Sequence, residues 1–166
     1  SQGASMLYQQ LLETTLTPTG KPDPAQVADL AGKLKNEFGG STYAQYGSLF
    51  VAKVAVDTGK LDDAASELNA IADKPSNPTL GEIARQRLAQ VLAAQNKADE
   101  ALKLLDGDAD KAFVATREEL KGDLLVQLGR TDEAHAAYQK AKAALSDEAA
   151  VGGLQIKLDD LAKGDA

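Results

Sequence analysis

The sequence predicts an all-α protein, and three observations support this fold class. Ala, Leu, Val and Ile carry most of its 43% hydrophobic content, whereas aromatic residues make up 4% and Trp is absent. Alanine and leucine favour helices, and small side chains let helices approach one another closely. Apolar residues recur at helical spacing, and one short turn motif occurs three times.

The first 40 residues predict two helices before the repeated part of the chain. Residues 5–15 place apolar side chains on one helical face. The turn formers of residues 17–22 end that segment. Asp23 then predicts a cap, and Pro24 the first position, of a helix that runs to about Phe38. Either Ser41 or Thr42 would cap the next helix.

A turn motif recurs at positions 59, 96 and 129, which are 37 and 33 residues apart. Each copy has Gly or Asn, a basic residue, any residue, two acidic residues and an alanine. Gly or Asn can adopt the left-handed conformation that ends a helix, and the acidic pair suits the start of the next. The copies read TGKLDDAA, QNKADEAL and LGRTDEAH, at residues 58–65, 95–102 and 128–135.

Small residues also recur where two helices of a hairpin should touch. Ala52, Ala89 and Gly122 each stand seven residues before a turn, and an alanine follows each turn. Larger side chains at these positions would push the helices apart. A tetratricopeptide repeat has about 34 residues and this arrangement of small positions.

We therefore expect a tetratricopeptide-like α-solenoid of antiparallel helical hairpins, forming a single domain over residues 1–166. Residues 1–40 would be extra N-terminal helices, and residues 41–145 three degenerate hairpins. Residues 146–166 would hold a capping helix, predicted over 148–161, because a terminal hairpin exposes apolar surface. That helix would use Val151, Leu154, Ile156, Leu158 and Leu161. The pair Gly152-Gly153 would allow a close helix approach or mark a bend.

Charge and composition exclude several classes of function. The net charge of −7 argues against binding to nucleic acid or to an anionic membrane surface. Without cysteine, the chain has no disulfide, thiolate metal site or cysteine nucleophile. No apolar run is long enough for a membrane span.

Candidate chemistry is weak, and we expect no catalytic residue, metal or cofactor. Asp106, Asp108 and Asp110 alternate like the start of a calcium loop, but Lys111 and Arg117 replace the required Gly and acidic ligand. His135 is the only histidine and is expected at the surface. Together with Glu119 it would be the best pair for an enzyme, yet no spacing joins the two residues.

The inner face of the first helix of each hairpin is the predicted partner-binding groove. We assign residues to this groove by their position along each helix. Some of these side chains could pack on the N-terminal helices instead. The predicted groove residues are Tyr46, Leu49, Lys53, Ile83, Gln86, Gln90, Glu119 and Asp123.

The order of these segments resembles the ancillary subunit of the Sec translocon, the YfgM-like family. The segments that carry the resemblance are residues 4–11, 41–44, 59–65, 88–92 and 121–125. The resemblance implies a periplasmic domain released from an inner-membrane anchor. It also implies partners among translocon subunits, periplasmic chaperones and exported client proteins, and it offers no catalytic residue.

The leading functional hypothesis is thus a non-catalytic protein-binding module beside the translocon. Its membrane association would depend on an anchor outside this sequence. The alternative is a soluble regulator that binds a stress-response signalling protein. The sequence leaves the oligomeric state open, including a homo-oligomer that exchanges segments.

Overall fold

The computed structural model describes residues 2–164, and all regular secondary structure in that range is helical, which confirms the predicted fold class. The chain divides after Val91 into two compact units, here called the N-terminal and C-terminal units. In the first lie α1 (Gln2–Glu13), α2 (Pro24–Phe38), α3 (Thr42–Asp57), α4 (Leu61–Asp73) and most of α5 (Pro78–Ala94). In the second lie α6 (Ala98–Leu104), the 3-10 turn η1 (Lys111–Phe113), α7 (Val114–Gln127), α8 (Thr131–Ala143) and α9 (Glu148–Gly164).

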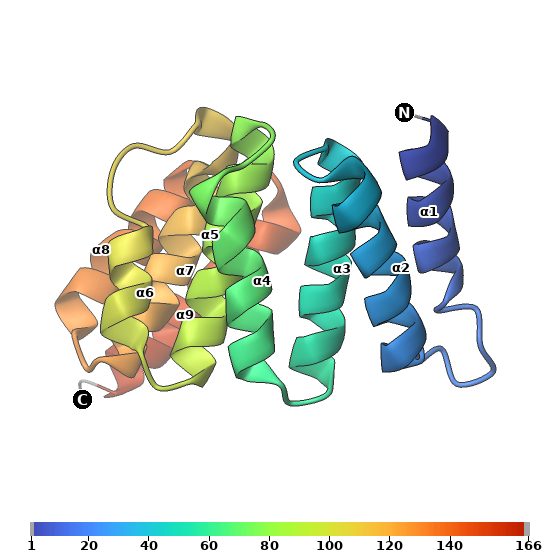
Figure 1. Cartoon of the computed structure of the whole chain (residues 1–166). Coiled ribbons are helices and arrows are strands. Elements are labelled where there is room, and N and C mark those ends of the chain that lie inside the picture. The colour runs from blue at the N-terminus through green and yellow to red at the C-terminus, as the bar shows by residue number, and fades with distance from the viewer. Residues whose placement is uncertain (1, 165–166) are drawn as a thin grey trace. The chain divides into compact units, whose positions relative to one another are not determined.

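In the N-terminal unit, α1, α2 and α3 pack against one another and α3 forms an antiparallel hairpin with α4 (Figure 1). Leu11 and Leu34 are fully buried between the first three helices. Gly47 of α3 makes this packing close, because a β-carbon there would lie 2.9 Å from Cδ1 of Leu34. Glycine at this position therefore sets how closely α3 approaches α2.

In the C-terminal unit, α7 and α8 form a second antiparallel hairpin and α9 packs on α8. Buried side chains from all three helices contribute to one apolar cluster. It consists of Leu125, Ala134, Ala137, Tyr138, Ala141, Leu154 and Leu158. The predicted capping helix is thus present, although it continues to Gly164 and not only to Leu161.

Helix starts follow the predicted caps. The Asp23 carboxylate accepts a hydrogen bond from Ala25 N at 3.1 Å, with Pro24 in the first turn of α2. Ser41, and not Thr42, caps α3, because its Oγ accepts from Ala44 N at 3.1 Å.

The first helix lies earlier than the predicted residues 5–15. It begins by Gln2 and ends at Glu13. The hydroxyls of Thr14 and Thr15 donate to the carbonyls of Leu11 and Leu12, at 2.6 and 2.8 Å. Threonine hydroxyls compete with the backbone in this way, and α1 ends where that competition begins.

The three repeated turns share one hydrogen-bond pattern. Gly59, Asn96 and Gly129 have φ angles of 77°, 64° and 73°, so each adopts the predicted left-handed conformation. The following basic residue donates its backbone N–H to the carbonyl five residues earlier, at 2.7, 2.8 and 2.8 Å. This is the Schellman ending of a helix. The alanines that follow, Ala64, Ala101 and Ala134, are all completely buried.

The last helix differs from the prediction at two points. Ile156 is 63% exposed, because it is only two residues from both Leu154 and Leu158 and so faces away from the core. Gly152 and Gly153 support no close approach, since a β-carbon at either would meet nothing within 4 Å. None of the helices within residues 2–164 combines the length and the apolar character needed to cross a bilayer.

Candidate protein-binding surfaces

The predicted inner face of α3 carries both exposed and buried side chains. Lys53 is exposed, and Tyr46 is 37% exposed. Leu49 is 8% exposed, so it contributes to the core and offers little surface to a partner. Lys53 and Tyr46 are therefore the accessible members of the predicted groove on this helix.

Tyr46 belongs to an aromatic cluster that joins α1 to α3. Its ring centroid lies 5.6 Å from that of Tyr8 and 6.1 Å from that of Tyr43, and the Tyr8 and Tyr43 centroids are 5.8 Å apart. Burial raises the pKa of Tyr8, with a smaller contribution from Tyr46. The N-terminal helix thus covers one end of the α3 face.

On α5, Gln90 is exposed whereas Ile83 and Gln86 are half-buried. The Gln86 amide donates to Oε1 of Glu82 at 3.2 Å, and Oε2 of the same carboxylate accepts from Arg85 at 2.9 Å. Glu82 is 4% exposed, so these bonds compensate a carboxylate that burial would otherwise disfavour. Of the three predicted groove residues on α5, Gln90 is the one that presents its side chain freely.

The predicted groove residues of α7 are engaged by α9. Lys157 Nζ donates to Oδ1 and Oδ2 of Asp123 at 2.9 and 3.1 Å, and lies 3.8 Å from Oε1 of Glu119. The Tyr138 hydroxyl also donates to Asp123 Oδ1, at 2.6 Å, and Lys157 Nζ lies 5.7 Å from the centroid of the Tyr138 ring. The Lys157 contacts are ion pairs and a cation over a π-face, and the Tyr138 contact is a hydrogen bond to a charged acceptor.

Gly122 explains why Tyr138 can reach this position. A β-carbon on Gly122 would overlap the Tyr138 ring, so the phenol lies directly against the α7 backbone. Burial raises the pKa of Tyr138 well above its usual value, and the hydrogen bond to Asp123 adds to the effect. The sequence predicted Gly122 as a small packing position and Asp123 as a groove residue, but it did not point to Lys157. The one hint was that Lys157 is a basic residue next to the apolar stripe of α9.

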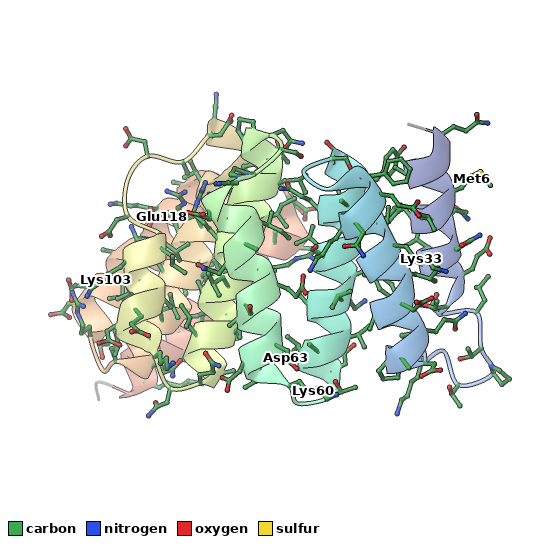
Figure 2. All side chains as sticks on the ribbon, viewed as in Figure 1. Met6, Lys33, Lys60, Asp63, Lys103 and Glu118 are labelled. Carbon is green, nitrogen blue, oxygen red and sulfur yellow. The ribbon has the colours of Figure 1, made fainter. Side chains whose placement is uncertain are left out.

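A pocket of about 540 Å³ opens on another face of the C-terminal unit. It lies beside α6, which has only seven residues and ends before the loop of residues 106–110. Figure 2 labels Lys103 of α6 and Glu118 of α7, which both line it. The other lining residues are Asp99, Leu102, Asp106, Lys121, Leu125, Arg130, Glu133, Ala136, Ala137 and Lys140. Its charges are mixed, with ion pairs between Lys121 and Glu118 and between Arg130 and Glu133.

The residues considered above for catalysis or metal binding have structural roles or lie at the surface. Asp110 Oδ1 accepts from Ala112 N at 3.2 Å and so begins η1. His135 is exposed on α8, as the sequence predicted. Within the described residues, no three His, Asp or Glu side chains converge in a way that could hold a metal ion.

Comparison with known proteins supports the resemblance found in the sequence. Residues 1–163 match the model of a tetratricopeptide repeat-like domain family. A protein of Escherichia coli (strain K12) named ancillary SecYEG translocon subunit is 30% identical over 162 residues, which cover 97% of this chain and 75% of that protein.

Two further relatives carry the same name. The Neisseria gonorrhoeae protein is 30% identical over 131 residues, covering 78% of this chain and 62% of its own length. The protein of Buchnera aphidicola subsp. Schizaphis graminum is 27% identical over 119 residues, or 72% and 61% of the two chains. With the repeated hairpin turns, these matches show that the chain belongs to the family of ancillary SecYEG translocon subunits with a tetratricopeptide repeat-like domain.

Proposed function

We propose that this chain is a non-catalytic protein-binding domain that acts beside the SecYEG translocon, on the periplasmic side of the inner membrane. The observation that carries the proposal is the 30% identity to the E. coli ancillary subunit over 97% of this chain. Helical-repeat domains suit such a role because stacked hairpins present extended faces to partner proteins. Translocon subunits, periplasmic chaperones and exported client proteins are the partners we infer.

The inner faces of α3 and α5 are the proposed contact surfaces, because Lys157 of α9 already engages Glu119 and Asp123 on α7. Tyr46, Lys53 and Gln90 are exposed there and offer an aromatic ring, a cation and an amide. Tyrosine is frequent at binding hot spots, because its ring is large and its hydroxyl is polar. A partner segment with apolar and acidic side chains would complement Tyr46 and Lys53.

Site-specific photocrosslinking tests this proposal in cells that make the full-length gene product. A photoreactive amino acid would replace Lys53 or Gln90, and antibodies against the SecYEG subunits would identify the adducts. Asn69 is the matched control, because it is exposed on α4, the second helix of the hairpin. We expect SecYEG or chaperone adducts from positions 53 and 90, and few from position 69.

Two results would contradict the proposed role. One is the absence of any SecYEG or chaperone adduct at positions 53 and 90 while the protein is present at its normal level. The other is equal crosslinking from position 69, which would mean that the contacts are not specific to the inner face. Capture of a signalling protein in place of SecYEG would favour the alternative role as a regulator.

A further inference from the structure

We propose that the α7–α8 face beneath α9 is a docking site for a lysine-bearing amphipathic helix of a partner protein, and that α9 occupies this site in cis. This inference rests on the proposed protein-binding function and adds the chemistry of one partner segment. It concerns the C-terminal unit alone, so it can be tested separately from the α3 surface.

The contacts of α9 show which apolar pattern the face accepts. Leu154 and Leu158 are 1% and 4% exposed, and both belong to the apolar cluster that includes Tyr138 and Ala141 of α8. The two leucines are four residues apart, so they lie on the same side of α9. A partner helix would need apolar side chains at the same spacing.

The charged contacts define a second part of the pattern. Lys157 follows Leu154 by three residues, and its ammonium group contacts the carboxylates of Asp123 and Glu119. The same ammonium group lies 5.7 Å from the centroid of the Tyr138 ring. Two carboxylates and a π-face suit a single cation, and the tyrosine hydroxyl holds Asp123 in place at 2.6 Å. The face therefore accepts a helix with a leucine at position i, a lysine at i+3 and a second leucine at i+4.

The sequence of α9 makes it a replaceable occupant. Gly152 and Gly153 lie within α9, where each lowers helix stability relative to alanine. A β-carbon on either would meet nothing within 4 Å, so packing does not require glycine at these positions. The pair thus weakens the cis helix without improving its fit to α7 or α8.

Electrostatics favours a basic competitor. The chain has a net charge of −7, which raises the local concentration of cationic segments. When α9 leaves, Asp123 and Glu119 lose the cation that they contact in this structure. A partner lysine that enters the same position restores the ion pairs, so exchange replaces one set of contacts with an equivalent set.

Peptide binding to the full chain tests the exchange. The probe is a fluorescein-labelled synthetic peptide with the sequence of residues 148–164, and its anisotropy reports binding. The variant Gly152→Ala/Gly153→Ala strengthens α9 without changing the face beneath it. We expect the variant to bind the peptide about tenfold more weakly than the wild-type chain, because α9 leaves the face less often.

Gly32→Ala is the matched control. Gly32 lies inside α2, and a β-carbon there also meets nothing within 4 Å. The substitution therefore strengthens a helix of the N-terminal unit, and we expect it to leave peptide binding unchanged. A peptide with Lys157→Met should bind the wild-type chain about tenfold more weakly, since its leucines remain but the cation is lost.

Several outcomes would overturn the inference. These are no binding of the unmodified peptide to the wild-type chain, equal binding to the wild-type chain and the double-alanine variant, or equal binding of the Lys157→Met peptide. A concentration-dependent dimer of the wild-type chain, measured by light scattering and abolished by the double-alanine variant, would assign the face to a second copy instead. Crosslinking at Lys53 would be unaffected in each case, so the proposed function would stand or fall separately.

Discussion

Gly122 of α7 lies directly against the ring of Tyr138 of α8, and even the ring's Cζ atom would be only 2.9 Å from a β-carbon at position 122. This contact sets the distance between the two helices of the hairpin. It also places the Tyr138 hydroxyl 2.6 Å from Asp123, the residue that follows the glycine. Because position 122 is a glycine, the two helices can pack closely and the Tyr138 hydroxyl can reach Asp123.

Gly122→Ala should destabilise the protein by about 1–3 kcal/mol, because the added methyl group forces Tyr138 or α7 to move. The free energy of unfolding in urea measures the effect. Gly32→Ala serves as the control and should stabilise by about 0.5–1 kcal/mol, since it adds a methyl group to a helix where space is free. Stabilisation by both substitutions would mean that the Gly122–Tyr138 contact does not restrict the hairpin.

The turn after α7 should depend on the left-handed conformation of Gly129, whose φ is 73°. Gly129→Ala should lower stability by about 1–2 kcal/mol, because an L side chain is strained there. Asn96 has a φ of 64° at the equivalent turn, and Asn96→Gly should change stability by less than about 0.5 kcal/mol. Thermal unfolding of both variants checks the pair, and an equal loss in the two would contradict the conformational explanation.

Gln45 joins α3 to the segment between α4 and α5. Its amide donates to Lys74 O and accepts from Ser76 N, both at 2.8 Å, and the residue is 9% exposed. Gln45→Ala should cost about 1–3 kcal/mol, because it leaves two backbone groups without these partners. Asn69→Ala, at an exposed position of α4, is the control for urea unfolding and should have little effect. A loss no larger than that of the control would show that water replaces the Gln45 bonds.

Tyr138 should make stability fall at alkaline pH. Burial, and then the hydrogen bond to Asp123, raise its pKa above the ordinary value of 10.0. Below that value the phenol is protonated in both the folded and the unfolded state, so it adds no pH dependence. Above it the unfolded chain loses the proton first, and the stability of the folded state decreases as pH rises.

Urea unfolding between about pH 9 and pH 11 tests this dependence. We expect a shallower decrease for Tyr138→Phe than for the wild-type chain, after normalisation to stability at neutral pH. Tyrosinate absorbance should show one fewer late-titrating group in the variant. An identical pH slope in the two proteins would mean that Tyr138 ionises as readily in the folded as in the unfolded state.

Much of the fold follows from local rules that operate within a few residues. Asp23 and Ser41 cap their helices through backbone N–H groups two and three residues away. Gly59 ends a helix because its backbone tolerates a positive φ, and Ala64 fits where the next helix returns. These effects need no distant partner, so the helices and hairpin turns could be predicted.

Positions that depend on distant neighbours could not be predicted in the same way. Periodicity gave Ile156 to the apolar face of its helix, but the packing of α9 leaves it exposed. Position along α3 made Leu49 a groove residue, yet it is buried. Lys157 carried no motif at all, and its importance became visible only beside Asp123 and Glu119.

The sequence by itself determined the helices, their turns and the small residues that let hairpins close, because each depends on backbone conformation or side-chain size at a single position. Only the tertiary structure decided which side chains remain free. That choice depends on which helices pack together, as when Tyr8 packs beside Tyr46 and Lys157 pairs with Asp123. Burial and ion pairing arise between segments that are far apart in the chain. The hydrophobic periodicity of one helix does not say which residues of another helix will lie opposite it.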